Sequence, residues 1–574
     1  MSSTVTSEPT VQRYRWNVAD LAPGDHLRAF DGVPPLVVQL LWNRLVREPN
    51  EIATFLAGDG APEHSPWLMR GVREAVERIV VARTAGETVA IYGDYDVDGM
   101  TGTAILAHCL QALGISTLPF LPRRDVEGYG LHQEAIARLR AAGARLLIAI
   151  DCGISGNAAV DFACGLDLDV IVADHHHVPE HLPRAVAVIN PAQPGCEYPF
   201  KGLCAAGIAY KLSEALLERF GLGSELAESW LDLATLGTVA DVVPLLDENR
   251  CLVSRGLRRI GSASRPGMKA LLAKAGMSAD SIDAQAIAFR LAPRLNAVGR
   301  LADPSIGLRL LLTEAADEGE ELATKLDEAN RERQRLTEAA LEHARQRIAA
   351  CPTLPKLLLM ADESYLPGVV GLVAGRLAEE LFRPVLVAGI HGEVVRGSAR
   401  SIASFHIAEA LAECDDLLIH HGGHARAAGF TLAAGNLEAL RRRLVGMAEH
   451  QLKDEDVEPS LAIDAEVSLR RWGTELYRVL ATLEPFGFAN PRPVLWSRRL
   501  RLRDARVIGR STPGHLKLTL VDGHTTWEAI GFGLGDRYHG LRDFVDVVYR
   551  VERNDWNGQT GVRLHILDLR PSIG

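Results

Sequence analysis

The stretch Gly93-Asp94-Tyr95-Asp96-Val97-Asp98-Gly99 decides the fold, because it places three carboxylates directly after the apolar run Thr88–Tyr92. A short apolar run that ends in a glycine-bounded polar loop is typical of a buried strand. Two further apolar runs end in potential metal ligands in the same way: Leu146–Ile150 before Asp151-Cys152-Gly153, and Val170–Ala173 before Asp174-His175-His176. The carboxyl ends of parallel strands meet at one edge of a sheet, so we expect these side chains to share one cleft.

Carboxylates and imidazoles packed this closely predict a divalent-metal site, because they would repel one another without a cation among them. Asp241, in Thr238-Val-Ala-Asp-Val-Val-Pro244 at an expected helix end, joins the set. The opening Asp94-x-Asp96-x-Asp98-Gly99 copies an EF-hand. That class is excluded because the twelfth position is Ile105 and the preceding segment is strand-like. A solvated acidic turn would explain one such loop, but not three successive strands that end alike.

The bulk composition is that of a globular protein with several domains. The 574 residues suggest roughly three or four domains, and the hydrophobic share of 47% with 24% charged residues is ordinary. The eight cysteines form no C-x-x-C pair, which favours reduced thiols over a disulfide or zinc framework. The polar Met1–Thr10 has no apolar core of a signal peptide, and no apolar run is long enough to span a membrane. We therefore expect a cytoplasmic protein.

The periodicity predicts an α/β fold with two α/β lobes, a long helix that joins them and a β-barrel after them. Strands and helices alternate from 88 to 189, which favours a mostly parallel sheet, and helices dominate from 205 to about 275. The charged, proline-free segment 314–350 predicts the joining helix. A second α/β lobe follows, with strands near 357–360 and 384–387. Short alternating runs predict a barrel of the OB kind: 461–467, 498–507, 515–520, 527–533, 546–551 and 563–568.

These elements predict five segments with the following bounds: an N-terminal segment packed on the core (1–70), a catalytic α/β domain (71–265), a helical region with the connecting helix (266–350), an associated α/β domain (351–455) and an OB-like domain (456–574).

The order of the motifs resembles the DHH phosphoesterase superfamily. The four acidic and histidine motifs resemble its catalytic domain, and Gly422-Gly-His-x-x-Ala-Ala-Gly429 resembles the domain that accompanies it. Two more stretches, Ala292–Leu301 and Arg506–Leu520, resemble the RecJ family of bacterial exonucleases within that superfamily. The likeness runs from about residue 70 to the C-terminus. One departure is Cys152, where the most familiar form has Asn; it leaves Asp151 intact and puts only the packing behind the ligands in question.

The resemblance implies a role for particular residues. Five match metal-ligand positions of the family: Asp96, Asp98, Asp151, His175 and Asp241. Five more match positions of the catalytic apparatus: Asp94 and Asp174, which would hold the loop or orient a ligand; His176, which would contact the scissile phosphate or support the ligands; and Arg294 and Asn296, expected near the substrate backbone. An anchor for a terminal 5′-phosphate is implied at Arg124, Ser398, Arg400, Gly423 and His424.

Phosphodiester hydrolysis agrees with this ligand set. The reaction needs a hydroxide nucleophile near neutral pH and neutralisation of the charge that develops on phosphorus. Two divalent ions about 4 Å apart supply both. Mixed carboxylate and imidazole ligands suit Mn²⁺ or Mg²⁺, and the histidine favours Mn²⁺.

Several features keep two interpretations. The Gly422-Gly423-His424 run is either a tight turn with a capping histidine or a backbone that approaches phosphate. Tyr129 either stacks on a terminal base or packs its own loop. Arg499, Arg501 and Arg503 alternate along one expected strand, so they form either a single-stranded nucleic-acid footprint or an ordinary soluble barrel face.

The net charge of −11 does not decide about DNA, because phosphates respond to local clusters of positive charge. Pyrophosphatases and small-nucleotide phosphodiesterases share the metal motifs but have no need of an arginine-rich barrel. A scaffold that has lost its ligands is disfavoured because every expected ligand is present. The resemblance therefore implies a metal-dependent 5′→3′ exonuclease of single-stranded DNA that releases 5′-mononucleotides in recombination and repair. It also implies a monomer, with a single-strand-binding protein and a RecQ-type helicase as partners.

Overall fold

The computed structural model describes residues 14–58, 63–124, 126–262, 265–278, 282–473, 475–509, 513–556 and 559–572. The polar N-terminal segment Met1–Thr10 lies outside these residues. The chain divides into two compact units. One, called here the parallel-sheet unit, comprises Asn50–Arg333 with Glu484–Pro491, and the other, the mixed-sheet unit, comprises Met1–Pro49, Gln334–Leu483 and Arg492–Gly574. No helix among the described residues is long and apolar enough to cross a membrane.

The parallel-sheet unit is built on five parallel strands in the order β3-β2-β4-β5-β6. The strands are β2 (Thr88–Tyr92), β3 (Thr117–Phe120), β4 (Ala144–Ile150), β5 (Asp169–Ala173) and β6 (Ala187–Ile189). The chain leaves β2 for β3 on one side and then returns to β4 on the other. In such a sheet the crevice forms where the strand order reverses, beyond the carboxyl ends of the strands.

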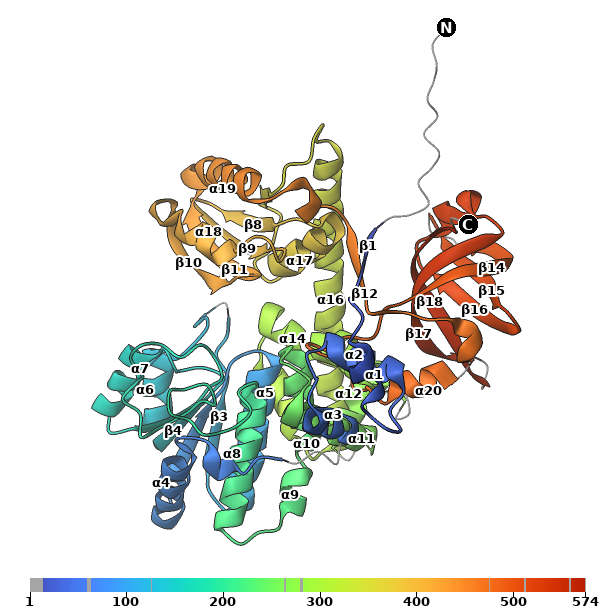
Figure 1. Ribbon diagram of the computed structural model, residues 1–574. Coiled ribbons are helices and arrows are strands. Elements are labelled where there is room, and N and C mark those ends of the chain that lie inside the picture. Colours follow the sequence, from blue (N-terminus) through green and yellow to red (C-terminus); the bar gives the residue numbers. More distant parts are fainter. Residues whose placement is uncertain are drawn as a thin grey trace. The chain divides into compact units, whose positions relative to one another are not determined.

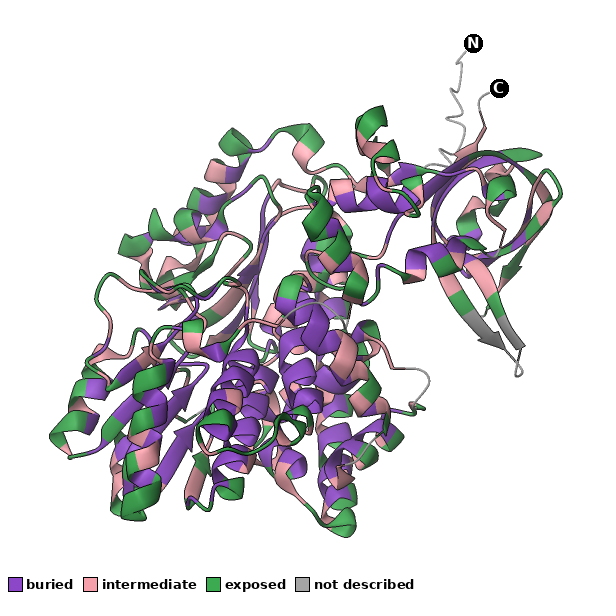
Figure 2. Ribbon diagram, turned by 60° about the horizontal axis from the view of Figure 1, so that its bottom comes forward, coloured by how far each residue is buried: buried purple, intermediate pink, exposed green. Residues whose placement is uncertain are grey.

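Helices cover both faces of this sheet, and its strands β2, β4 and β5 are almost entirely buried (Figures 1 and 2). One apolar core contains α4 (Val72–Ala85), α5 (Val97–Ala112), α8 (Ala205–Arg219) and α10 (Leu231–Ala240). The core on the other face contains α6 (Gln133–Ala141) and α7 (Asn157–Gly165). A strand that is buried on both faces has no polar alternation, which is why the runs at 88–92, 146–150 and 170–173 are continuously apolar.

Further helices complete this unit: α3 (Pro49–Ala57), α9 (Ser224–Glu228), α11 (Asp247–Ser262), α12 (Pro266–Lys274), α13 (Ala284–Ala286), the π-turn η4 (Ile287–Leu291), α14 (Ala292–Leu301) and α15 (Ser305–Leu312). The predicted connecting helix is α16 (Ala316–Ala349), which is unbroken over 34 residues. Its early apolar residues belong to the large core of the parallel-sheet unit, whereas its late ones pack on β7 and α17. Exposed pairs such as Lys325 with Glu321, 2.6 Å apart, support it at i,i+4 spacing.

The mixed-sheet unit holds a second α/β sheet in the order β10-β11-β9-β8-β7, in which only β7 and β8 are parallel. Its strands are β7 (Leu358–Asp362), β8 (Val385–His391), β9 (Val394–Arg400), β10 (Leu418–His424) and β11 (Ala427–Ala433), with α17 (Val370–Leu381), α18 (Ile407–Ala412) and α19 (Leu437–Gln451). The strands β9, β10 and β11 were not predicted, because each contains glycine and none shows the regular β-branched alternation of a strand.

The predicted barrel is present and closed. Its strands pair in the order β14-β15-β16-β18-β17, and β17 pairs back with β14. They are β14 (Leu495–Ile508), β15 (His515–Asp522), β16 (Thr525–Gly531), β17 (Phe544–Trp556) and β18 (Gln559–Pro571), with α20 (Glu475–Ala481) before them. The fold class predicted from the sequence, two α/β lobes with a long helix and an OB-like barrel, is therefore confirmed.

One predicted strand, 461–467, is two. The segment β12 (Ser460–Ile463) pairs with β1 (Arg15–Val18) in a separate two-stranded sheet, and β13 (Ala465–Glu466) pairs with β14. Asp464 separates them, because its side chain accepts the amide of Val494 at 2.9 Å. The N-terminal helices α1 (Gly24–Arg28) and α2 (Pro35–Asn43) belong to the same unit, and Asn43 donates to the carbonyl of Asp464 at 2.8 Å.

Candidate metal centre

The metal-ligand candidates gather at the carboxyl edge of the parallel sheet, at the reversal of strand order. The loop Gly93–Gly99 follows β2, Asp151 follows the neighbouring strand β4, and Asp174-His175-His176 follows β5. Asp241 caps the C-terminus of α10. The fold thus brings together groups that lie about 150 positions apart in the sequence.

The loop after β2 turns directly into α5. The carboxylate of Asp96 caps this helix by accepting the amides of Asp98 and Gly99 at 3.0 and 3.1 Å. A Cβ on Gly99 would lie 2.5 Å from the backbone nitrogen and oxygen of Asp94, so only glycine allows the turn to close. The spacing of the three aspartates therefore follows from strand, tight turn and helix cap.

The five predicted ligands lie within reach of one ion or a pair of ions. The Nε2 atom of His175 is 3.2 Å from Asp151 Oδ1, 3.6 Å from Asp241 Oδ2 and 3.8 Å from Asp98 Oδ2. Three groups of donor atoms each lie within 4.8 Å of one another: Asp98, His175 and Asp241; Asp94, Asp96 and Asp151; and Asp151, His175 and His176.

Three atoms of this cluster are shielded from water and accept or donate no hydrogen bond: Asp151 Oδ1, His175 Nε2 and Asp94 Oδ1. Leaving a buried polar atom unpaired costs about 1–3 kcal/mol, and more for a charged one. Carboxylate oxygens and an imidazole nitrogen that converge on one another in this way are a donor set for a divalent cation. The residues present therefore fit a metal centre.

The electrostatics of the cluster agree with this assignment. Burial and then repulsion by Asp96 raise the pKa of Asp94 to about 8, and burial with repulsion by Asp98 and Asp96 raises that of Asp241 to about 9. Burial and the same neighbours raise the pKa of Asp151 well above its usual range, and burial lowers that of His175. Carboxylates that resist ionisation beside a neutral imidazole need a bound cation to become fully charged.

The backbone around α8 holds Asp98 in place. The first amides of this helix, those of Ala205 and Ala206, donate to the two carboxylate oxygens of Asp98 at 2.7 and 2.8 Å. A helix N-terminus carries partial positive charge, so these amides attract the Asp98 carboxylate. This contact was not predicted, because nothing in a run of small residues indicates that its amides face an aspartate.

Backbone strain accompanies two positions of the site. Asp151 has φ of 63° and Val242, directly after Asp241, has φ of 60°. Non-glycine residues in this region cost of order 1–3 kcal/mol, and the cost is highest for β-branched side chains. Asp151 is itself a predicted ligand, and Val242 directly follows another, so the packed fold maintains this strain at the cluster.

Asp174 positions His176. Its Oδ1 accepts a hydrogen bond from the His176 amide at 3.1 Å and another from the ring Nδ1 of His176 at 2.8 Å. Its Oδ2 accepts a hydrogen bond from the amide of Ile154 at 3.0 Å. Burial alone would raise the pKa of Asp174, but these hydrogen bonds lower it, and they raise the pKa of His176 against the effect of burial.

The hydroxyl of Tyr129 lies 3.3 Å from His176 Nδ1, and the two rings meet edge-on at 5.7 Å. Tyr129 nevertheless remains 52% exposed, so it packs the site and still presents surface to solvent.

The predicted Arg-x-Asn element contacts the metal loop through Asn296. Its Oδ1 accepts the amide of Val97 at 3.1 Å, and a Cβ on Gly299 would lie 2.3 Å from the carbonyl oxygen of Tyr95. Helix α14 therefore lies directly against the loop. Arg294 instead donates to Asp327 on α16 at 3.0 Å and to the carbonyl of Arg290.

Cys152 is buried behind Asp151, and its thiol donates to the carbonyl of Tyr92 at 3.9 Å.

The predicted phosphate anchor falls in both units. Ser398 and Arg400 lie on β9, and Arg400 donates to the Ser398 hydroxyl at 2.9 Å.

The other predicted anchor residues Gly423 and His424 lie on β10 and not in a tight turn. A Cβ on Gly423 would lie 2.3 Å from the Ala427 carbonyl oxygen, so close packing on β11 already requires this glycine. Arg124 belongs to the parallel-sheet unit, where it is exposed with its guanidinium 5.8 Å from the Tyr95 ring.

The predicted arginine stripe lies on β14, and Arg499, Arg501 and Arg503 are all exposed. Exposure alternates along the stripe, with Leu500 buried and Leu502 half-buried between the arginines, but the pairing with the neighbouring strands is interrupted. The ladder with β17 shifts register between Ser497 and Leu500, and the ladder with β15 shifts between Leu502 and Asp504. These bulges turn the strand, as at many barrel corners.

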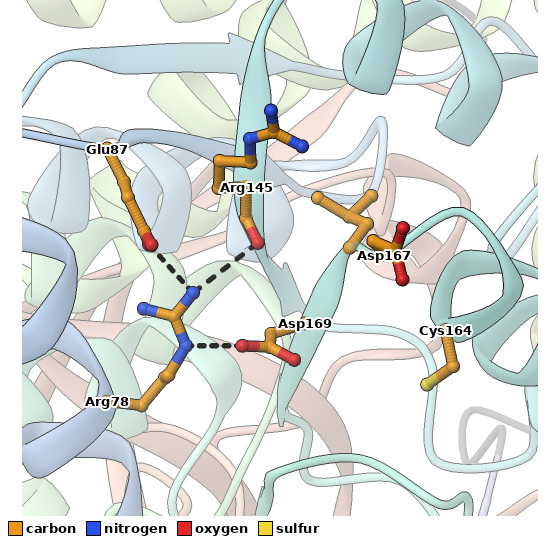
Figure 3. Close-up of a pocket in the computed structure, with 7 residues that line it drawn as sticks. Arg78, Glu87, Arg145, Cys164, Asp167 and Asp169 are labelled. Atoms are coloured by element: carbon orange, nitrogen blue, oxygen red, sulfur yellow. Dashed lines mark hydrogen bonds and ion pairs between the residues drawn. The ribbon is translucent and has the colours of Figure 1, made fainter. Parts of the chain in front are cut away.

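A polar cavity of about 340 Å³ lies at the opposite, amino-terminal edge of the parallel sheet (Figure 3). Arg78 reaches across it and binds Glu87 at 2.7 Å and Asp169 at 2.6 Å, so its charge is already paired. Arg145, Cys164 and Asp167 complete its rim. The cavity is separate from the metal centre, and none of the possible metal-binding groups among the described residues includes a residue of its lining.

A parallel sheet with a carboxylate and histidine centre at its carboxyl edge defines a metal-dependent phosphoesterase of the DHH class. Three family models match the chain: DHH family, N-terminal domain, over residues 88–238; DHHA1 domain over 354–449; and RecJ OB domain over 463–568. The chain belongs to the RecJ family.

Relatives and a solved structure support this membership over nearly the whole chain. The single-stranded-DNA-specific exonuclease RecJ of Bacillus subtilis is 37% identical over 94% of this chain and 68% of its own length. The protein of the same name from Escherichia coli is 34% identical over 94% of this chain and 96% of its own. The crystal structure of RecJ with Mn²⁺ from Thermus thermophilus matches with a TM-score of 0.84 and 32% identity, over 98% of this chain and 80% of that one.

Proposed function

We propose that this chain is a metal-dependent 5′→3′ exonuclease that hydrolyses single-stranded DNA to 5′-mononucleotides in recombination and repair. The observation that carries the proposal is the cluster of Asp96, Asp98, Asp151, His175 and Asp241 with its unpaired buried atoms. That cluster occurs in a chain that also has the RecJ OB domain. A small-nucleotide phosphodiesterase would have no need of the barrel.

The protein's own residues would hold and orient the reacting groups. Asp96, Asp98, Asp151, His175 and Asp241 would bind Mn²⁺ or Mg²⁺, and such ions supply Lewis acidity that makes water nucleophilic near neutral pH and offsets charge on the phosphate. His176 is held by Asp174, stays partly exposed beside the cluster and has a raised pKa. It is therefore suited to donate a hydrogen bond to an oxygen of the scissile phosphate. Asn296 keeps the metal loop in place through the Val97 amide.

Polarity would come from an anchor for the 5′-phosphate. Ser398 and Arg400 are preorganised on β9 by their mutual hydrogen bond, and a guanidinium binds phosphate in a bidentate manner. Gly423, His424 and Arg124 would add to this anchor, and Tyr129 would stack on a base beside His176. The exposed Arg499, Arg501 and Arg503 on β14 would hold the strand on the barrel. We further propose a cytoplasmic monomer that works with a single-strand-binding protein and a RecQ-type helicase.

An end-labelled oligonucleotide tests this function. A single strand with a label at either end is incubated with Mn²⁺ and the full chain, with Asp96→Ala as the control. Early release of a labelled mononucleotide from the 5′-labelled strand, with gradual shortening of the 3′-labelled one, is the expected result. Digestion of only di- to pentanucleotides would replace the proposal with a small-nucleotide phosphodiesterase. Metal-independent binding without digestion would replace it with a scaffold.

A further inference from the structure

A second cavity, of about 590 Å³, lies within the mixed-sheet unit and is separate from the metal cluster. Tyr14 of the N-terminal segment lines it, together with Glu379 of α17 and Phe382 directly after that helix. Three arginines also line it: Arg400 on β9, Arg426 in the turn after β10 and Arg550 in the barrel. Its volume falls within the range of about 300–1,000 Å³ that is usual for small-molecule sites.

The charges around this cavity are unbalanced. Three arginines line it, against the single carboxylate of Glu379. Among the residues that the structure describes, neither Arg426 nor Arg550 has a carboxylate oxygen within 4.0 Å of its guanidinium. Two guanidinium groups that lack a carboxylate partner at one cavity favour an anionic ligand.

Arg550 is the residue most clearly in need of a partner. It is half-buried on β17, and its Nε is shielded from water and makes no hydrogen bond. Burial, and then the nearby charge of Arg492, lower its pKa. The two carboxylates that attract it are engaged elsewhere: Glu552 with His565 at 2.8 Å, and Asp464 with Arg44 at 3.7 Å.

The remainder of the wall is apolar and aromatic. The rings of Tyr14 and Phe382 meet edge-on with centroids 5.9 Å apart, and Leu461 and Leu567 add aliphatic surface. Leu567 is the extra residue of a bulge in β18, because Val548 pairs with Asp568 and Tyr549 with Ile566. Bulges commonly re-aim a side chain next to a binding site. Aromatic rings beside guanidinium groups match a ligand that carries both a base and a phosphate.

We propose that this cavity binds a nucleotide, with Arg550 and Arg426 on its phosphate and Tyr14 and Phe382 against its base. The nucleotide is either free or part of a strand. The site is distinct from the metal centre and needs no metal. It rests on the proposed function only in the choice of a deoxynucleotide as the probe.

Calorimetric titration of the full chain in EDTA tests the site without hydrolysis. Thymidine 5′-monophosphate is compared with thymidine, and wild type with Arg550→Met and Arg426→Met. Arg426 is exposed, so its replacement leaves the core intact. The matched control is Arg553→Met, an exposed arginine on the same strand that does not line the cavity.

We expect the monophosphate to bind wild type, and thymidine to bind about tenfold or more weakly, because a charge-assisted hydrogen bond is lost. Arg550→Met and Arg426→Met should each weaken binding of the monophosphate about tenfold, and Arg553→Met less than twofold. No binding to wild type, or equal binding to wild type and Arg550→Met, would overturn the inference. The second result would place the nucleotide at another site.

Hydrolysis of a twenty-nucleotide thymidine strand with Mn²⁺ distinguishes the two sources of the nucleotide. If the cavity binds the strand, Arg550→Met raises KM with little change in kcat. If it binds a free nucleotide, added monophosphate changes the rate of wild type more than that of Arg550→Met, in which only inhibition by product at the metal centre remains. Normal hydrolysis without monophosphate binding overturns only this inference, whereas binding without any hydrolysis overturns only the proposed function.

Discussion

Replacement of Gly299 by alanine tests how tightly helix α14 holds the metal loop. The added Cβ would lie 2.3 Å from the carbonyl oxygen of Tyr95, whereas ordinary contact begins at 3.4 Å, so helix and loop must separate by about 1 Å. Tyr95 stands between Asp94 and Asp96, so this displacement passes directly to the metal cluster. A misplacement of about 1 Å in an active site can reduce the rate roughly 100-fold, and we expect a loss of that size in kcat/KM.

The assay measures release of mononucleotides from a single strand with saturating Mn²⁺, together with the Mn²⁺ affinity and the Tm. The matched control is Gly446→Ala in α19, a helical glycine whose added Cβ meets nothing within 4 Å. Alanine there should leave activity unchanged and stabilise the helix by about 0.5–1 kcal/mol. Activity of Gly299→Ala within threefold of wild type would refute the reasoning, and an equal loss in Gly446→Ala would show that the effect is not local to the loop.

Three more outcomes follow from the buried charges. Asp151→Asn should reduce hydrolysis at least about 100-fold, because it removes a predicted metal ligand. It should not lower the Tm of the metal-free chain, because the carboxylate it removes is repelled by its neighbours. Retained turnover would contradict the role of Asp151 as a ligand. Asp94 and Asp241, with pKa values of about 8 and about 9, are largely protonated at pH 7 without metal. Mn²⁺ binding should therefore release protons and tighten as the pH rises from 6 to 8. Calorimetry in buffers of different ionisation enthalpy measures this, and a proton count of zero would contradict it. Lys211→Met should lower the free energy of unfolding by about 3–5 kcal/mol, because it removes the buried ion-pair partner of Glu214, at 2.5 Å, and of Glu248, at 3.1 Å. A change below about 1 kcal/mol in urea unfolding would contradict the importance of these ion pairs.

The sequence alone determined the parallel sheet and predicted the candidate metal ligands. Continuous apolar runs followed by short acidic loops have one compatible placement, at the carboxyl edge of a sheet buried on both faces. The long helix was equally clear, because 34 residues without proline carry a regular mixture of charged and apolar side chains. The barrel followed from short alternating strands with turn residues between them.

Only the tertiary structure decided how the ligands are held and which residues support them. Three contacts join segments about 100 to 200 residues apart: the α8 amides donate to Asp98, the Val97 amide donates to Asn296, and Gly299 packs on Tyr95. Each depends on a backbone group whose position no side-chain pattern encodes. The pairing of β1 with β12 and the bulges of β14 are of the same kind. Local sequence specifies propensity and burial, whereas contacts between distant backbone groups are set by how the packed elements meet.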